Sequence, residues 1–168
     1  GVFEIGPADF PEYGYALSPG REIKLSESSI SKSRKQFLRP LDIAIAIKGS
    51  VGKVAILPLE MPESGDGGWV VGQSCLVLRV DDRGMIDPRV IFSFLKSELG
   101  QAQLKQIVSG ASVALIQLRE LEKIRIPLPD AEMQGKVVSA FGKIVEIEQI
   151  VANSRNEQRR LSNSIWTI

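Results

Sequence analysis

The sequence predicts a mixed α/β protein, in which a compact domain with a twisted β-sheet and short helices is followed by a long C-terminal coiled-coil helix. Short apolar runs separated by Gly, Pro and Asp turns fill residues 1–129, a pattern typical of strands and short helices in one domain. From residue 130 onward the apolar residues are spaced alternately three and four apart, as in a helix that pairs with another helix. We therefore expect two parts, a compact domain over 1–129 and a long spacer helix over 130–168.

Composition argues against several classes of protein. Lys and Arg number 21 against 20 Asp and Glu, so the formal net charge is only +1. The chain has no histidine, which removes the commonest general base and zinc ligand and every Ser/His/Asp triad. No apolar run approaches the roughly 20 residues that span a bilayer. The single cysteine, Cys75, lies in an apolar run and fits a small buried residue in a reducing cytoplasm. We expect no catalytic site and no metal site.

Local patterns predict the elements of the compact domain. Residues 1–20, rich in Gly, Pro and aromatics, predict an irregular lead-in, and the Ser-rich residues 25–36 a loop or short helix. Two apolar runs flank a Gly-Ser-Val-Gly turn, so residues 43–57 predict a β-hairpin. The remaining expected elements are a surface loop over 58–68, strands over 69–71 and 74–80, helices over 88–99 and 101–108, and strands near 112–117 and 123–127.

The first of these helices has clear start and stop signals. Asp87 can cap the free N–H groups, and Pro88 fits the first helical position. Gly100 suits the left-handed position that ends many helices. In the later helix, Asp130 and Glu132 fall in the first turn, where carboxylates complement the helix dipole, although such a pair also fits a metal-dependent nuclease.

The terminal helix is expected over 131–166, about 54 Å long at 1.5 Å per residue. Its seam runs through Val137, Ala140, Ile144, Ile147, Val151, Ser154, Gln158, Leu161 and Ile165, and the expected dimerisation residues are its large apolar members Val137, Ile144, Ile147, Val151, Leu161 and Ile165. A second apolar row, Val138, Phe141 and Val145, exists only in the first half of the helix. We expect this half to pack on its own domain as well as on a partner helix. The alternative is a helix folded back entirely on its own core.

The hairpin turn superficially matches a phosphate-binding loop. However, Ile47 stands where that loop needs glycine, and Val54 stands where Ser or Thr would hold the metal. A hairpin tip is the better interpretation. The side chains beside it that suit phosphate oxygens are Lys48, Ser50 and Lys53.

Charge and amide side chains add further candidates. Residues 21–53 carry eight basic and three acidic residues, a local charge of +5. Such a cluster fits either a solvated face or a phosphate-binding face. Gln73, Ser112 and Gln117 lie at strand ends, where an amide can pair with adenine or can simply be a surface group.

Five segments occur in an order that resembles one known family. They are Leu41-Asp42-Ile43 with the turn Lys48-Gly49-Ser50-Val51-Gly52-Lys53, then Gln73-Ser74, then Ser109-Gly110-Ala111-Ser112, then Leu121-Glu122-Lys123-Ile124-Arg125-Ile126-Pro127-Leu128-Pro129, and Glu132-Met133-Gln134. Over roughly residues 20–150 the chain resembles the target-recognition domain of type I restriction–modification specificity subunits. It departs from the pattern at Met133, where an acidic residue is usual, and in the extra loop 58–68.

The resemblance implies a module that reads double-stranded DNA and has no chemistry of its own. In this family two recognition domains, spaced by antiparallel helices, each read half of a bipartite target and dock adenine-N6 methyltransferase subunits. S-adenosylmethionine is then expected only on those partner subunits, and the partner helix would come from a second copy or a second recognition domain. The implied phosphate contacts are Lys32, Arg34, Lys35, Lys48 and Lys53, and the implied base contacts are Ser50, Gln73, Ser112 and Gln117.

Three alternatives remain at this point. The chain could be the C-terminal recognition domain of a fused DNA methyltransferase, which predicts a catalytic Asn/Asp-Pro-Pro-aromatic motif upstream. It could be a protein-interaction module that uses its helix as a scaffold and binds no DNA. It could also be a carboxylate-metal nuclease, which predicts magnesium-dependent cutting by this chain alone.

Overall fold

The β-hairpin predicted from the sequence lies at the centre of the fold. The computed structural model describes residues 1–32, 34–62 and 64–166, without the side chains of 31–34. In it β3 (Ile43–Ala46) pairs antiparallel with β4 (Val54–Ile56) on one edge and with β6 (Cys75–Leu78) on the other. Every residue of β3 and β4 is buried, because both faces of the hairpin are covered.

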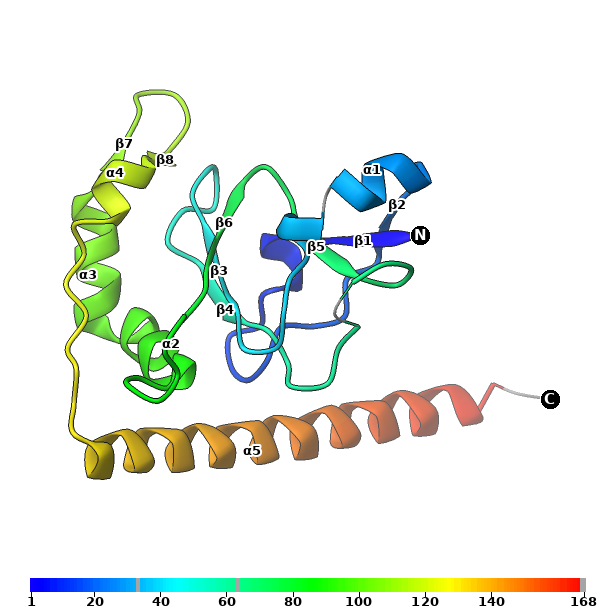
Figure 1. Cartoon of the computed structure of the whole chain (residues 1–168). Coiled ribbons are helices and arrows are strands. Elements are labelled where there is room, and N and C mark those ends of the chain that lie inside the picture. Colours follow the sequence, from blue (N-terminus) through cyan, green and yellow to red (C-terminus); the bar gives the residue numbers. More distant parts are fainter. Residues whose placement is uncertain (33, 63, 167–168) are drawn as a thin grey trace.

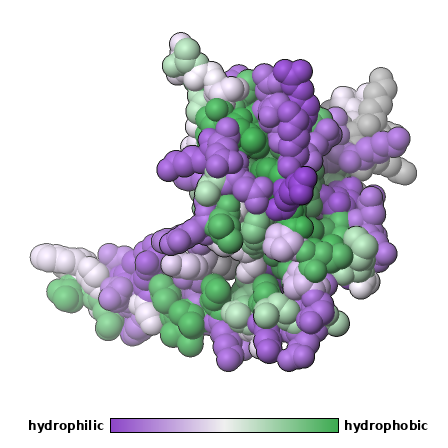
Figure 2. All heavy atoms as spheres, turned by 90° about the vertical axis from the view of Figure 1, so that its left-hand side faces the viewer, coloured by the Kyte–Doolittle hydropathy of each residue, from purple (hydrophilic) through white to green (hydrophobic). Residues whose placement is uncertain are grey.

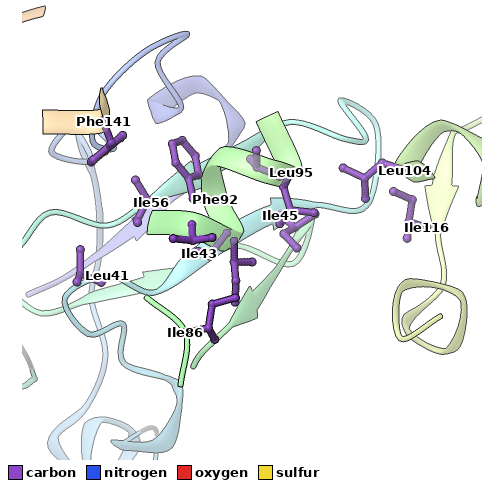
Figure 3. Packing of buried hydrophobic residues seen from close by; sticks show 13 residues of the cluster. Leu41, Ile43, Ile45, Ile56, Ile86, Phe92, Leu95, Leu104, Ile116 and Phe141 are labelled. Carbon is purple, nitrogen blue, oxygen red and sulfur yellow. The ribbon is translucent and has the colours of Figure 1, made fainter. Parts of the chain in front are cut away.

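The two faces of the hairpin belong to two different cores. Successive side chains of a strand point to opposite faces. Ile43 and Ile45 accordingly join the larger cluster, with the helices, whereas Ala44 joins the smaller cluster around Leu38 and Trp69. Figure 3 shows the larger cluster, with Phe141 near Phe92 and Ile56 at one end and Leu104 and Ile116 at the other.

A second small sheet contains the first residues of the chain. β1 (Val2–Ile5) lies between β2 (Arg21–Ile23), to which it is antiparallel, and β5 (Trp69–Val71), to which it is parallel. The prediction of an irregular lead-in over 1–20 is therefore wrong for its first residues, and η1 (Pro7–Asp9) adds a turn of 3-10 helix. The strand was missed because only two of its four side chains, Val2 and Ile5, are fully buried. Beside this sheet, α1 (Glu27–Lys32) and η2 (Arg34–Gln36) fulfil the prediction of a short helix.

The predicted helix 88–99 ends earlier than expected. Asp87 caps it as predicted, because its carboxylate accepts a hydrogen bond of 2.8 Å from the Arg89 N–H. However, α2 (Pro88–Lys96) stops at Ser97, which caps the next helix, α3 (Glu98–Gln106). Gly100 therefore lies inside α3, and a Cβ there would stand 2.1 Å from the carbonyl oxygen of Phe94. The glycine serves close packing of the two helices and not a helix end.

The segment after α3 also differs from the sequence prediction. α3 ends at Gln106 and not at 108, and a small hairpin of β7 (Val108–Ser109) and β8 (Leu115–Ile116) leads into α4 (Leu118–Leu121). The predicted strand 123–127 forms no ladder. Instead the carboxamide of Gln103 pairs with both backbone groups of Arg125, at 3.1 Å each. A side chain thus satisfies backbone groups that an adjacent strand would otherwise satisfy.

The long helix α5 (Ala131–Ser164) begins as predicted. Asp130 caps it by accepting a hydrogen bond of 2.9 Å from the Met133 N–H. Its 34 residues extend over about 51 Å at 1.5 Å per residue. Phe141 is buried and lies edge-on to Tyr15 and Phe92, with ring centroids 5.1 and 5.7 Å apart. The expectation that the first half of this helix packs on its own domain is confirmed.

The helix and the loops occupy opposite sides of the molecule. In Figure 1, α5 runs along the lower side, whereas the β3–β4, β5–β6 and β7–β8 connections lie toward the upper side. Within the described ranges 1–32, 34–62 and 64–166, no helix is both long enough and apolar enough to cross a membrane.

Candidate nucleic-acid interface

Backbone hydrogen bonds bring three connections together at one edge of the central sheet. The Ile47 N–H donates to the carbonyl of Ser74 at 2.8 Å, and the Ile47 carbonyl accepts from the Ile116 N–H at 2.8 Å. One residue further on, the Gly49 N–H donates to the Ala114 carbonyl at 3.1 Å. We call this region, residues 47–50, 73–74 and 112–117, the loop edge. Gly49 has a φ of 74°, a left-handed conformation that glycine adopts without strain.

Five of the candidates for DNA contact lie at the loop edge, and all five are exposed. They are Lys48, Ser50, Gln73, Ser112 and Gln117. They include a cation, two hydroxyls and two carboxamides, a set that can contact both phosphates and base edges. Gln117 has its orientation fixed, because its side-chain oxygen accepts a hydrogen bond of 3.0 Å from Arg119 Nε. Residues distant in the sequence therefore form one polar surface.

The other four candidates lie elsewhere or outside the described side chains. Lys53 is exposed but lines a separate hollow with Glu12 and Lys96, where burial lowers the pKa of the Lys96 ammonium. Lys35 is exposed and lines a hollow that it shares with Gln73. The candidates whose side chains fall outside the described part are Lys32, at the end of α1, and Arg34, at the start of η2.

An ion pair joins the start of β3 to the end of β6, at the end of these strands that is far from the loop edge. Asp42 is fully buried, and Arg79 donates to its two carboxylate oxygens at 2.8 and 2.6 Å. The Arg39 N–H donates to the same carboxylate at 2.8 Å. The hydrogen bonds that Arg79 donates to Asp42 raise the pKa of its guanidinium, which therefore stays charged. Asp42 is the central residue of the Leu41-Asp42-Ile43 motif, but the sequence alone does not predict its ion pair.

A glutamine ties the hairpin turn to the helices. Gln101 donates from one side-chain nitrogen to the carbonyl of Gly52 at 3.0 Å and to that of Leu95 at 2.7 Å. The turn is thereby attached to the end of α2. Nothing in the local sequence pattern around Gln101 points to this role, because both partners are backbone carbonyls.

Another glutamine fixes the base of α5. The Gln134 amide donates to the carbonyls of Met85 and Pro129 at 3.1 and 3.0 Å, and its oxygen accepts from the Asp87 N–H at 3.0 Å. The start of α5 is therefore joined to the start of α2. This accounts for the glutamine that follows the Pro-Leu-Pro exit in the quoted motif.

The expected dimerisation residues divide into two groups. Val137 and Val151 are half-buried, and Val137 packs on the larger core. The other four expose apolar surface, with relative exposures of 36% for Ile144, 57% for Ile147, 53% for Leu161 and 77% for Ile165. Along the lower edge of Figure 2, which α5 forms, apolar and hydrophilic residues alternate on the surface. The seam therefore lies on a flank of the helix that its own domain leaves largely uncovered.

No group of three or more Cys, Asp or Glu side chains that could hold a metal ion occurs among the described residues. Cys75 is buried as expected, and burial raises the pKa of its thiol.

Comparison with known proteins identifies related domains. The family model for the type I restriction modification DNA specificity domain matches residues 11–158. The crystal structure of a type I restriction–modification system S subunit from M. genitalium is similar, with a TM-score of 0.62 and 19% identity over 90% of this chain and 36% of that chain. A chain from a structure described for complex assembly and conformational transition of the type I R-M system has a TM-score of 0.57 and 20% identity, over 98% of this chain and 36% of that one. The sequence thus spans about a third of these solved chains. No curated protein matches it.

Proposed function

The chain belongs to the type I restriction modification DNA specificity domain family, and we propose that it reads double-stranded DNA for such a system without performing chemistry itself. In this role it directs adenine-N6 methyltransferase subunits, and the restriction activity that accompanies them, to one half of a bipartite site. S-adenosylmethionine is bound by the methyltransferase partner and not by this chain. The function places the chain in the cytoplasm, where the DNA is.

The observation that carries this proposal is the loop edge. Lys48, Ser50 and Gln73 come from two connections, and Ser112 and Gln117 come from a third, yet hydrogen bonds through Ile47 and Gly49 hold all three together. A lysine can neutralise a phosphate in any sequence, whereas the carboxamides can distinguish base edges in the major groove. A surface that combines both kinds of group supports affinity together with sequence preference.

The position of α5 supports a second recognition domain as partner. The helix lies on the side opposite the loop edge in Figure 1, so a partner helix on its flank leaves the loop edge free for DNA. The chain spans 36% of the related subunits, so a longer assembly has room for another recognition domain. We propose that this domain is either a second copy of the chain or another part of the same polypeptide.

The salt dependence of DNA binding tests the proposed function. The 168-residue chain is titrated against a 30-base-pair duplex pool of random sequence, and anisotropy is followed at several salt concentrations. Lys48→Ala should weaken binding to all sequences and reduce the salt slope by about 1, because one phosphate contact is lost. Lys143→Ala is the control, since it removes a cation from α5. An unchanged salt slope in the Lys48 variant would show that the β3–β4 turn does not contact DNA phosphates.

A fused methyltransferase polypeptide is the alternative context for the same domain. Sequencing the full reading frame tests it, because a fused enzyme would carry an Asn/Asp-Pro-Pro-aromatic motif upstream. A reading frame without that motif would indicate that the domain belongs to a separate specificity subunit.

A further inference from the structure

A polar hollow runs beside η2 and along β6, from Gln73 in the loop edge to Arg79 just past the end of the strand. Lys35, Gln36, Gln73 and Arg79 are among the residues that line it. No carboxylate is among the lining residues that the structure describes. The neighbouring Glu4 is occupied, because Arg21 lies 2.5 Å from its carboxylate. The hollow thus has two cations, one of them already paired with a carboxylate, and two carboxamides on its walls.

Arg79 reaches this hollow with a guanidinium that is only partly used. An arginine has five N–H donors, one on Nε and two on each terminal nitrogen. Nε and Nη2 donate to Asp42, and Nη2 also donates to the carbonyl of Phe37 at 3.1 Å. Within the described part of the chain no acceptor takes a hydrogen bond from Nη1. The side chain is 27% exposed, and so it presents free donors while the rest of the group is held in place.

The geometry of these bonds indicates which ligand the hollow takes. An arginine that reads guanine uses two neighbouring nitrogens as a fork toward O6 and N7. Here the Asp42 carboxylate occupies Nε and Nη2, so neither possible fork is free. A single nitrogen with two free N–H groups can still donate to a phosphate oxygen, and Lys35 adds a second positive charge. A phosphate therefore fits better than a base edge.

We propose that Arg79 and Lys35 form a phosphate-binding site for the DNA backbone, in the hollow that Gln73 lines at the other end of β6 from Arg79. This rests on the proposed function and extends it to a residue that sequence reasoning assigned no role. The buried Asp42 fixes the guanidinium before DNA arrives, so little side-chain freedom is lost on binding. A phosphate held here would set the register in which Gln73 meets the bases.

Two substitutions test the site in the full 168-residue chain. Lys35→Gln removes the free cation, and Arg79→Lys keeps a cation beside Asp42 but removes Nη1. Binding is measured against the random-sequence duplex pool and against a single duplex selected from that pool by the wild-type chain, over a range of salt concentrations. Lys35→Gln removes a charge and should lower the salt slope by about 1, whereas Arg79→Lys keeps the charge and should lower affinity with little change in slope. Each substitution should weaken both complexes by the same factor.

Matched controls separate DNA contact from loss of structure. Arg89 also makes a two-pronged pair with an aspartate, Asp87, at 2.9 and 2.8 Å, but near the base of α5. Arg89→Lys therefore perturbs a similar ion pair away from the hollow and should leave the salt slope unchanged, as should Lys143→Gln. If circular dichroism shows that Arg79→Lys is unfolded, the salt slope of Lys35→Gln alone tests the phosphate-binding site.

The outcomes distinguish this site from the proposed function. An unchanged salt slope in Lys35→Gln and an unchanged affinity in Arg79→Lys, with a wild-type chain that binds and a Lys48→Ala variant that weakens binding, would overturn the site and leave DNA recognition intact. An altered sequence preference at constant salt slope would also overturn it, because the hollow would then contact a base. A wild-type chain that binds no duplex would overturn the site together with the proposed function.

Discussion

Polar residues divide into two groups at the scale of single side chains. Those at the loop edge are exposed and make few contacts within the molecule, as ligand-contacting groups do. Others, such as Asp42, Gln101 and Gln134, make hydrogen bonds within the fold and hold its segments together. Removing one partner of an ion pair such as Asp42–Arg79 leaves an uncompensated buried charge and costs about 3–5 kcal/mol. Substitutions in the second group are therefore expected to alter DNA binding only through the fold.

Gln73→Ala tests the expected base contact. We expect it to relax sequence preference by about 1–3 kcal/mol at one base pair, because the bidentate amide contact is lost, while the salt slope stays unchanged. Selection of duplexes from a random pool, followed by sequencing, measures the preference. Gln149→Ala is the control, because Gln149 is exposed on α5 and its amide nitrogen bonds to the Asn153 oxygen of the same helix. An identical selected sequence for the Gln73 variant and wild type would exclude a base contact.

At the scale of elements, the junction between α2 and α3 shows how packing overrides a local signal. Gly100 is a plausible helix end in the sequence, yet it lies within α3 at the point where this helix meets the end of α2. Alanine normally stabilises a helix interior relative to glycine. Here an added Cβ would meet backbone atoms that cannot rotate away, so the usual preference should reverse.

Gly100→Ala is therefore expected to lower the free energy of unfolding by about 1–3 kcal/mol, as overpacking does. Gly142→Ala is the matched control, because Gly142 is also helical but has no atom within 4 Å of a built Cβ. It should raise the free energy of unfolding by about 0.5–1 kcal/mol. Urea denaturation of both variants measures the difference. Equal stabilisation by the two substitutions would contradict the close helix contact.

Elements with their own start signals or apolar runs could be predicted from the sequence. The hairpin 43–57, the Asp87 cap and the start of α5 belong to this group. Those that depend on distant partners could not: β1 is defined by its pairing with β5, and the backbone of Arg125 bonds to the Gln103 side chain and not to a strand. The same holds for the site. Exposed polar residues at turns pointed to the loop edge, whereas the free donor of Arg79 depends on bonds to Asp42 and Phe37 that no local pattern reveals.

At the scale of the whole molecule, two surfaces of different character lie on opposite sides. The loop edge is polar and lies opposite α5, while the flank of α5 exposes apolar side chains over much of its length. Exposed apolar residues at coiled-coil spacing are typical of helices that pair. This arrangement fits a module in which the helix sets the distance to a second recognition domain.

Ile147→Asp tests the pairing of α5. A buried carboxylate in an apolar seam is strongly unfavourable, so the variant should have the mass of a monomer where the wild-type chain has that of a dimer. Multi-angle light scattering measures both masses. Gln149→Asp adds the same charge at a polar, exposed position of the helix and should leave the mass unchanged. A wild-type chain that is already monomeric at high concentration would contradict pairing between copies.

Selection of duplexes from a random pool by the wild-type chain, alone and with the proposed methyltransferase partner, is the most direct measurement of the central claim. We predict binding that falls steeply with salt concentration and the enrichment of one defined sequence, because lysine and carboxamide groups act together at the loop edge. Recovery of a pool without sequence enrichment, or no binding even in dilute buffer, would contradict the claim.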